Sequence, residues 1–464
     1  MAFVRYKKIG KNEYAYEVSQ KWDKENKKAV QTQKYLGVVV DREEKIYAMP
    51  RKDKQKVRAE KEILDYGDSY LMNELVKDTP AVNVMSNVFK ERYDTLQSLI
   101  FHRIANGSAF VYANNWYEGN YAKILFPNAK LSSQDISNFL KYLGREDVQR
   151  RFFREYLSKV CKEKSGIIID STGLPNEIDF PLCEWGYHNG GIEKETRLIL
   201  AVDKETKRPL YFRYVAGNIN DVSTLKNTIE ELKKFSVNTA FSILDSAYCS
   251  EENICELFGK NISFLTRLPS GRKLYKSLIA ENSGKIELKE NSVVYGERGL
   301  FVKKLQIDLY GHKAWAYIVC DPERRGREIS KRLVKRDKED EFDFSSCGMM
   351  ILISDLEFNA NEVVPLYYTR QSAERLFGIA KDDLGILPVR THSEDTFRGF
   401  LFLVFLSLIF YMDIRVRFNE PIESVLSLMR NLKCKVFEDG IIISELSARQ
   451  KDFLKIIVPN LHGI

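Results

Sequence analysis

A set of charged and polar residues between Tyr367 and Lys381 has the types and the spacing for chemistry on phosphate. The stretch YYTRQSAERLFGIAK places Tyr367, Arg370, Glu374 and Lys381 at steps of three, four and seven residues. At 3.6 residues per turn, these steps put all four side chains within about 60° on one helix face. A carboxylate, two cations and a phenol on one stripe could bind a metal ion and a phosphate backbone together, which predicts nucleic-acid chemistry. The alternative is a solvated helix face with ordinary charge pairs.

Two aspartates stand where apolar runs end. Asp170 closes GIIID and Asp245 closes TAFSILD, so we expect both at the carboxyl ends of strands, where sites in open sheets gather. If these strands are neighbours, the carboxylates repel each other and a divalent cation relieves the repulsion. Oxygen ligands suit Mg²⁺ or Mn²⁺, and Glu374 as a third ligand would complete a two-metal site. The alternative is that these aspartates only serve turns and caps.

The composition is that of an ordinary soluble globular protein with two to four domains. The chain has 464 residues, of which 44% are hydrophobic and 30% charged. Seven cysteines form no CxxC pair and only five histidines are present, which argues against a zinc cluster or a disulfide framework. We therefore expect reduced cysteines and a cytoplasmic protein.

No membrane partner is expected. MAFVRYKKIG lacks the apolar core of a secretory signal. The longest uncharged apolar run, from Gly399 to Met412, is short for a bilayer and is bracketed by Arg398 and Asp413. It predicts a buried core helix.

The net charge of +7 is concentrated at the N-terminal end. Residues 1–62 hold 17 Lys and Arg against 10 Asp and Glu, and the remaining residues balance to zero. This asymmetry predicts a polyanion-binding arm, with a merely soluble basic surface as the alternative.

The pattern along the chain predicts a mixed α/β organisation. From residue 166 the order is three strands, then helix, strand, helix and strand, which is typical of a mixed sheet flanked by helices. Ahead of it, LSSQDISNFLKYLG with its Ser-x-x-Asp cap and VQRRFFREYLSKV predict helices. We expect six segments: a basic β-hairpin module (1–62), a helical DNA-binding region (63–160), the first part of a core (161–269), a β-rich insertion (270–348), the second part of the core (349–415) and a C-terminal region (416–464).

These segments resemble bacterial insertion-sequence transposases with an Asp-Asp-Glu triad, of the insertion-sequence-four superfamily. The spacing of Tyr367, Arg370, Glu374 and Lys381 matches the Tyr-Arg-Glu-Lys signature of that family without a gap. IIIDSTGLP and ILDSAYCSEENI resemble the segments around its two aspartates, and AGNINDVSTL is similar to its Gly-Asn-x-x-Asp segment. LPVRTHSEDTFRGFLFLVFLSLIF looks like the segment after the signature. The resemblance covers residues 166–412 well and the first 40 residues loosely.

The resemblance implies a ribonuclease-H-like fold for the core and roles for the site residues. It implies that the metal ligands are Asp170, Asp245 and Glu374. It also implies that phosphates near the transposon end are held by Tyr367, Arg370 and Lys381. An arginine fork and a lysine point charge suit phosphate oxygens.

The family also carries a β-rich insertion between the second aspartate and the glutamate, and residues 270–348 occupy that place. In some members an aromatic residue of the insertion stacks on a flipped base. Trp315 in KAWAYIV, with Tyr310 and Tyr317 behind it, is the candidate here. The alternative is a Trp315 that packs into the β core. The basic run Arg324–Arg336 suits a DNA backbone or, given the acids after it, a solvated helix.

Three further residues have weaker claims. His392 matches a family position, but a structural role is the alternative. Asp355 ends ILISD and competes with Glu374 as the third carboxylate, although it lacks the arginine and lysine companions. His188 stands in WGYHNGG, where the subgroup often carries more charge.

The function that the resemblance implies is DNA transposition. The enzyme would bind the ends of its element in double-stranded DNA, cleave them with Mg²⁺ or Mn²⁺, and join the 3′ ends to target DNA. A homodimer on DNA and a nucleoid-associated location in a bacterial cytoplasm are expected. The alternatives are a catalytically retired, transposase-derived DNA-binding protein and a ribonuclease-H-like DNA nuclease.

Overall fold

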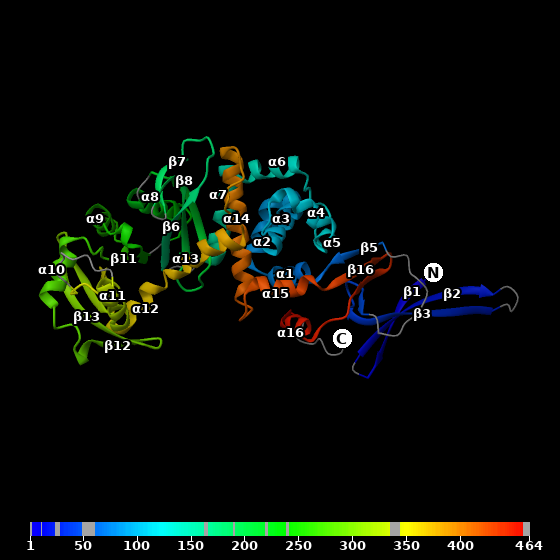
Figure 1. The fold of residues 1–464 in the computed structure, drawn as a ribbon. Coiled ribbons are helices and arrows are strands. Elements are labelled where there is room, and N and C mark those ends of the chain that lie inside the picture. Colours follow the sequence, from blue (N-terminus) through cyan, green and yellow to red (C-terminus); the bar gives the residue numbers. More distant parts are fainter. Residues whose placement is uncertain are drawn as a thin grey trace. The chain divides into compact units, whose positions relative to one another are not determined.

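The computed structural model describes residues 2–10, 12–23, 28–48, 61–161, 166–188, 191–218, 221–237, 241–334 and 344–457 (Figure 1). The chain forms two compact units. The first comprises residues 1–148, 383–385 and 398–464, and the second comprises residues 149–382 and 386–397.

The first unit contains a mixed seven-stranded sheet made from both ends of the chain. Its order is β1 (Ala2–Ile9), β2 (Asn12–Asp23), β3 (Lys28–Asp41), β4 (Ile46–Ala48), β17 (Gly440–Ile443), β16 (Lys433–Phe437) and β5 (Glu62–Asp65). β17 pairs with β4 in parallel, and the other pairs are antiparallel. The C-terminal hairpin therefore lies between two strands of the N-terminal segment.

Helices supply the rest of the first unit: α1 (Gly67–Val76), α2 (Pro80–Phe89), α3 (Tyr93–Asn106), α4 (Ala113–Glu118), α5 (Ala122–Leu125), α6 (Ser133–Leu143), α15 (Ile422–Arg430) and α16 (Ala448–Ile457), with the 3-10 turns η1 (Lys90–Arg92) and η2 (Phe110–Tyr112). The predicted cap of α6 is confirmed, because the Ser132 hydroxyl accepts a hydrogen bond from the Asp135 amide at 3.1 Å. The helix predicted from VQRRFFREYLSKV is α7 (Glu146–Val160), most of which belongs to the second unit.

The long apolar helix α14 (Glu394–Arg415) is the core helix that its composition predicts. It is long and apolar enough to cross a membrane by length and composition, but 89% of its most apolar window is buried inside the protein. Phe402 packs on Phe89 of α2 and Phe410 packs on Phe101 of α3. Gly399 lets α14 approach α6 closely, since an added Cβ would lie 1.8 Å from the Leu140 carbonyl oxygen.

The second unit contains a mixed ten-stranded sheet, which confirms the mixed α/β class. Its order is β12 (Ser292–Tyr295), β13 (Arg298–Leu309), β14 (His312–Cys320), β15 (Met349–Ser354), β11 (Ser263–Arg267), β10 (Phe241–Leu244), β6 (Ile167–Pro175), β8 (Gly191–Asp203) and β7 (Glu184–His188), while β9 (Pro209–Ala216) also pairs with β8. β10 runs parallel to both β6 and β11, and the other pairs are antiparallel.

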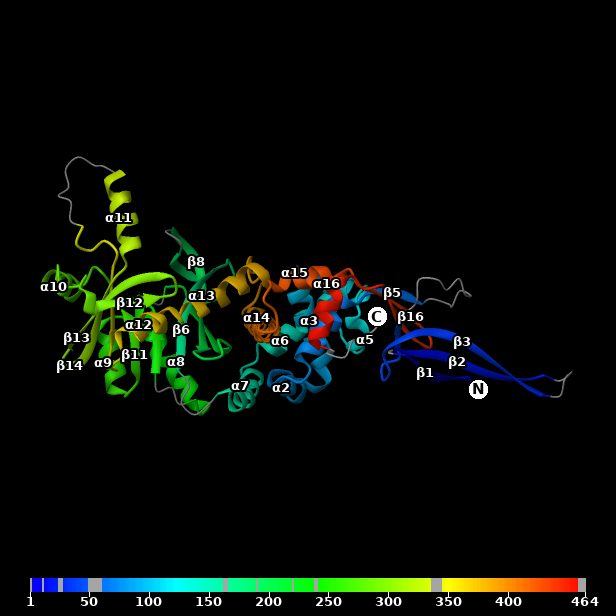
Figure 2. The same ribbon diagram turned by 90° about the horizontal axis from the view of Figure 1, so that it is seen from below.

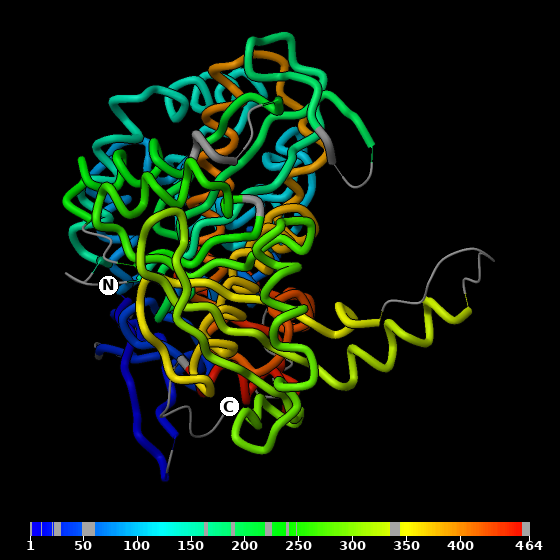
Figure 3. Tube along the Cα trace, turned by 90° about the vertical axis from the view of Figure 1, so that its left-hand side faces the viewer, coloured from blue at the N-terminus to red at the C-terminus, as the bar shows by residue number. Residues whose placement is uncertain are grey.

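Helices flank this sheet: α8 (Asp221–Lys234), α9 (Glu251–Gly259), α10 (Lys273–Asn282), α11 (Pro322–Val334), α12 (Ala360–Tyr368) and α13 (Gln371–Gly378), with the 3-10 turns η3 (Ser246–Tyr248) and η4 (Lys289–Asn291). Figure 2 shows α8 and α9 along one side of the sheet and α12 and α13 along the other. α11 projects from the unit in Figures 2 and 3, and it has no buried residue.

The segment expected as a β-rich insertion contributes β12, β13 and β14. These strands do not form a separate sheet, because β14 pairs with β15 and so continues the sheet of the second unit. The six segment boundaries expected from the sequence stay predictions.

Candidate active site at the edge between β6, β10 and β11

The strand register brings the two aspartates together. Ile169 of β6 lies beside Leu244 of β10, and Leu244 lies beside Thr266 of β11. The next residue of each chain segment therefore continues the same row: Asp170, Asp245 and Arg267. In parallel neighbours such residues share an edge of the sheet.

One expectation about this edge needs correction. Asp170 does not end its strand, because β6 runs on to Pro175 while paired with β8. Its pairing with β10, however, stops at Ile169. Asp170 is thus the first residue of β6 beyond its pairing with β10.

The guanidinium of Arg370 lies among the three carboxylates. Its Nη1 is 2.9 Å from Asp170 Oδ2 and 3.0 Å from Asp245 Oδ2. Its Nη2 is 2.5 Å from Glu374 Oε1. One cation therefore joins residues from β6, from the end of β10 and from α13, although Asp170 and Glu374 are 204 positions apart in the sequence.

Burial shapes the charge of this cluster. Asp170 is 7% exposed, and its burial raises the pKa to about 7, against the opposing effect of Arg370; Asp245 and Glu374 add to the rise. For Arg370, burial alone would lower the pKa, but the neighbouring carboxylates raise it well above its usual range. The cluster has more negative than positive charge, so it favours an additional cation.

The donor set fits a hard divalent cation by its chemistry. Three carboxylates supply the oxygen ligands that Mg²⁺ and Mn²⁺ prefer. In the part of the chain that the structure describes, no group of three or more acidic, histidine or cysteine side chains is arranged as a ready metal cluster. The three carboxylates instead form ion pairs with Arg370, whose guanidinium takes the place of a metal cation between them.

The helix predicted from Tyr367 to Lys381 is not continuous. α12 ends at Tyr368, α13 begins at Gln371, and a π-helical turn, η5 (Ile379–Asp383), follows. Pro365 lies inside α12, and the Arg370 amide bonds to the carbonyl of Tyr367, three residues back. The spacing rule assumed an unbroken α-helix, and these short-range bonds change the phase.

Tyr367 and Lys381, at the two ends of this segment, contact different parts of the second unit. Tyr367 is 5% exposed, its pKa is raised by burial to about 12, and its ring is 6.0 Å from the Arg370 guanidinium. Lys381 donates a hydrogen bond from Nζ to Thr172 Oγ1 of β6 at 2.7 Å, and burial lowers its pKa. The π-turn thus returns Lys381 to the strand that carries Asp170.

Trp315 lies apart from the carboxylates. It pairs with Ser354 of β15, which in turn pairs with Leu265 of β11, so it is two strands away from β11 and is partly buried. Lys304 lies 4.7 Å from the ring centre and Lys313 lies 5.6 Å from it. No contact joins Trp315 to the three carboxylates among the described residues.

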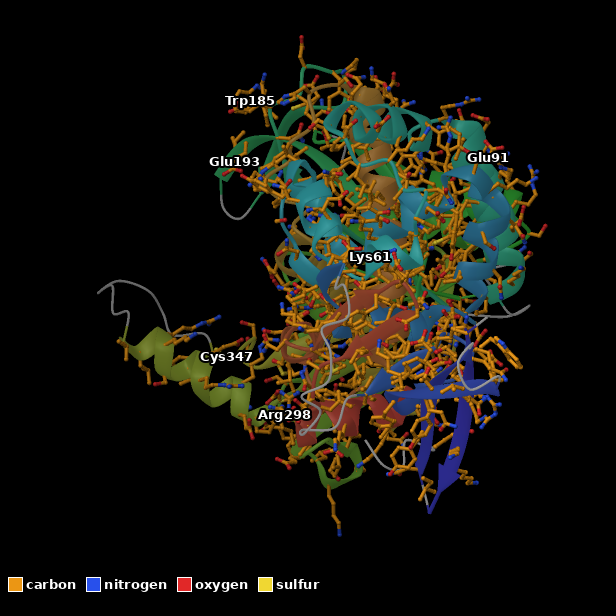
Figure 4. The ribbon with its side chains drawn as sticks, turned by 90° about the vertical axis from the view of Figure 1, so that its right-hand side faces the viewer. Lys61, Glu91, Trp185, Glu193, Arg298 and Cys347 are labelled. Carbon is orange, nitrogen blue, oxygen red and sulfur yellow. The ribbon has the colours of Figure 1, made fainter. Side chains whose placement is uncertain are left out.

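Trp185, which the sequence analysis did not single out, is more exposed than Trp315. It is 59% exposed on β7, in the hairpin with β8 that Figure 4 marks by Trp185 and Glu193. Lys194 lies 5.9 Å from its ring centre. Its exposure and the nearby lysine depend on the β7–β8 hairpin, so the sequence alone carries no signal for this position.

The other candidate residues from the sequence have no contact with the three carboxylates among the described residues. Asp355 accepts a hydrogen bond from the Phe264 amide at 2.7 Å and is not among the groups around Arg370. His392 is exposed, and the side chain of His188 lies outside the described residues. In the basic run, Arg324 pairs with Glu328 at 2.6 Å and Arg325 pairs with Glu287, while residues 335 and 336 lie outside the described part.

Arg267 is a further site residue that the sequence analysis did not identify. The only signal is a basic residue at the end of the apolar run SFLTR, and its meaning depends on β11 lying beside β10. Thr266 fixes this placement by donating a hydrogen bond from its hydroxyl to the Asp245 carbonyl at 3.0 Å.

The chain was compared with curated proteins, with solved structures and with models of protein families. No curated protein matches the chain. Among solved structures, it is similar to a piggyBac transposase in a synaptic complex with hairpin DNA, with a TM-score of 0.41 and 10% identity over 85% of this chain and 80% of that one. A family model described as the transposase DDE domain matches residues 162–410. That span is more than half of the chain and contains Asp170, Asp245 and Glu374, so the protein belongs to the family of the transposase DDE domain.

Proposed function

We propose that this protein is a DNA transposase that cuts the ends of its own insertion sequence and joins the 3′ ends to target DNA. The observation that carries the proposal is the convergence of Asp170, Asp245 and Glu374 on one guanidinium. The matched family supports a transposase. The motif spacing supports the insertion-sequence-four superfamily, and the mixed order of β6, β8, β9, β10 and β11 supports a ribonuclease-H-like core.

The proposed roles follow from the chemistry of the side chains. Asp170, Asp245 and Glu374 hold Mg²⁺ or Mn²⁺. Bound there, such ions would supply activation of the attacking oxygen and stabilisation of the leaving oxygen. Arg370 lies within reach of all three carboxylates and positions them. The planar fork of its guanidinium also suits hydrogen bonds to phosphate oxygens. Tyr367 and Lys381 flank this group, so a DNA strand is held where the carboxylates meet.

The N-terminal strands offer a surface for the ends of the element. The register places Phe3, Arg5 and Lys7 of β1 on the same face as Tyr16 of β2 and Tyr35 of β3. Arg5 lies 5.7 Å from the Phe3 ring centre and Lys7 lies 5.6 Å from that of Tyr16. The Tyr16 and Tyr35 rings are 5.3 Å apart. Cations between aromatic rings suit both the phosphates and the sugar and base surfaces of DNA.

Cleavage of the element's own ends tests the catalytic roles. The probe is a duplex oligonucleotide that carries the inverted repeat flanking the coding sequence. Asp170→Ala, Asp245→Ala and Glu374→Ala are each expected to abolish Mg²⁺-dependent nicking while leaving duplex binding intact. The exposed Glu290 provides the control, and Glu290→Ala is expected to nick at the wild-type rate. Full activity in any of the three variants would remove that residue from the site, and a wild type that binds but never nicks would favour a retired transposase.

Binding to the same duplex tests the N-terminal face. Arg5→Ala combined with Lys7→Ala removes two cations, so affinity is expected to fall and the salt dependence of binding to weaken by about two in slope. The control changes the opposite face, where Lys34 pairs with Glu17 at 4.0 Å, through the double variant Lys34→Ala and Glu17→Ala. Equal losses in the two double variants would assign binding to another surface.

The proposed function also implies an oligomeric state and a cellular location. Joining two ends requires two active sites, so we expect a homodimer on DNA in the bacterial cytoplasm, associated with the nucleoid. Size-exclusion chromatography with light scattering, with and without the end duplex, measures the first of these. A complex with one chain per pair of ends would contradict it.

A further inference from the structure

A small cavity opens beside the carboxylate cluster in the second unit. It has a volume of about 130 Å³ and is lined by Arg267, Arg324, Tyr367, Tyr368, Arg370 and Glu374, among others. Space of this size accommodates a few water molecules or one small polar group, and it is too small for a nucleotide.

The lining of this cavity is strongly cationic. Three arginines face one carboxylate, Glu374, which is already paired with Arg370. Arg324 is partly neutralised by Glu328 at 2.6 Å. The guanidinium of Arg267 has no hydrogen bond and no ion pair among the described residues, and it is only partly exposed. A cation held in this way has unused donors that face the cavity.

The sheet fixes Arg267 at the same edge as the catalytic aspartates. It follows Thr266, which lies beside Leu244, so it occupies the row of Asp170 and Asp245. The hydrogen bond from Thr266 to the Asp245 carbonyl ties the two strand ends together. The backbone of Arg267 is also paired with Leu352 of β15. Arg267 is therefore positioned by regular strands and not by a loop.

We propose that this cavity binds one phosphate of the DNA strand next to the bond that is cut, with Arg267 as its main ligand and Arg324 at its rim. The ligand class follows from the charge and the shape, because the guanidinium fork offers paired donors to phosphate oxygens. A bound phosphate also compensates the positive charge of Arg267, whose guanidinium has no ion pair among the described residues. The inference rests on the proposed function, since it places this phosphate relative to the carboxylates.

A cycle of protein and DNA changes tests this contact. End duplexes are prepared with a single neutral methylphosphonate at each position near the cleavage site. For wild type, one position is expected to weaken binding in EDTA and slow Mg²⁺-dependent cleavage by about 10- to 100-fold, the effect of one charge-assisted contact. Arg267→Ala is expected to show that loss on unmodified DNA and no further loss at that one position. Arg267→Lys, which keeps the charge but lacks the fork, is expected to recover part of it.

The controls separate this inference from the function on which it rests. Arg272 is exposed and five residues along the chain, and Arg272→Ala is expected to match wild type at every position. If wild type does not cut at all, the proposed function fails, but the binding cycle in EDTA still reports on the phosphate contact. Equal sensitivity of wild type and Arg267→Ala to the methylphosphonate at every position would overturn the inference. So would normal binding and cleavage by Arg267→Ala on unmodified DNA, provided that thermal unfolding shows both proteins to be folded.

Discussion

At the scale of single residues, Arg370 decides how three acidic side chains coexist in a partly buried place. The spacing within YYTRQSAERLFGIAK predicted that Arg370 and Glu374 would lie together, and they do. It could not predict that the same guanidinium also contacts Asp170 and Asp245, because that depends on the pairing of β6 with β10. Arg267 was missed for the same reason, since a lone arginine after an apolar run has meaning only beside its neighbouring strand.

The raised pKa of Asp170 predicts a pH-dependent stability of the metal-free protein. A carboxyl whose pKa is about 7 in the folded state, against an ordinary value of 3.8, binds more protons when folded than when unfolded. Its contribution to the free energy of unfolding is therefore complete below about pH 4 and is lost as the pH rises toward 7, by up to about 1.4 kcal/mol per pH unit.

Urea unfolding in EDTA across this pH range measures the effect. Asp170→Asn removes the titrating group, so its stability relative to wild type is expected to increase between pH 4 and pH 7. Glu290→Asn, at an exposed carboxylate of the same unit, provides the comparison and is expected to follow wild type. Parallel curves for wild type and Asp170→Asn would show that Asp170 titrates normally.

At the scale of elements, short-range signals were informative where one helix or strand decides its own structure. The apolar runs at GIIID, TAFSILD, SFLTR and ILISD all form strands, and Ser132 begins α6 as its cap pattern predicts. The predicted helix through residues 367–381 is wrong in its middle. Pro365 and the tight bonds around Arg370 interrupt it, and a spacing rule contains no information on such breaks.

The contact between α6 and α14 gives a prediction of unusual sign. Replacing glycine by alanine inside a helix normally stabilises it by about 0.5–1 kcal/mol. At Gly399 the added methyl group would meet the Leu140 carbonyl oxygen at 1.8 Å, so α14 must move away from α6. Gly399→Ala is therefore expected to lower the free energy of unfolding by about 1–3 kcal/mol.

Gly326 in α11 offers the matched control. An added Cβ there meets nothing within 4 Å, so Gly326→Ala is expected to be neutral or slightly stabilising. Thermal unfolding of both variants, followed by circular dichroism, measures the difference. A Gly399→Ala protein that is as stable as Gly326→Ala would mean that the two helices adjust without cost.

At the scale of the whole molecule, the sequence indicated the class but not the connections. The mixed sheet of the second unit follows from the order of strands and helices. The sheet of the first unit does not, because β16 and β17 insert between β4 and β5 from almost 400 residues away. Pairings over such distances leave no periodic signal, so the N-terminal module was predicted as a hairpin by itself.

Removing the C-terminal hairpin tests this connection. Deleting residues 433–443 leaves the edges of β4 and β5 without partners, so amide hydrogens of Tyr47 and Leu64 are expected to exchange much faster. Exchange in β6 and β10 of the second unit serves as the internal control and is expected to stay slow. Unchanged protection at β4 and β5 would mean that the N-terminal strands hold together unaided.

The same hairpin affects when the protein becomes complete during synthesis. β4 leaves the ribosome early, but its parallel partner β17 is made almost 400 residues later. At roughly 5–20 residues per second, the delay is on the order of 20 to 80 s. During that interval the sheet is incomplete, and the edge of β4 that will pair with β17 is open. A nascent or truncated chain therefore lacks a finished first unit, and only the full-length polypeptide carries one.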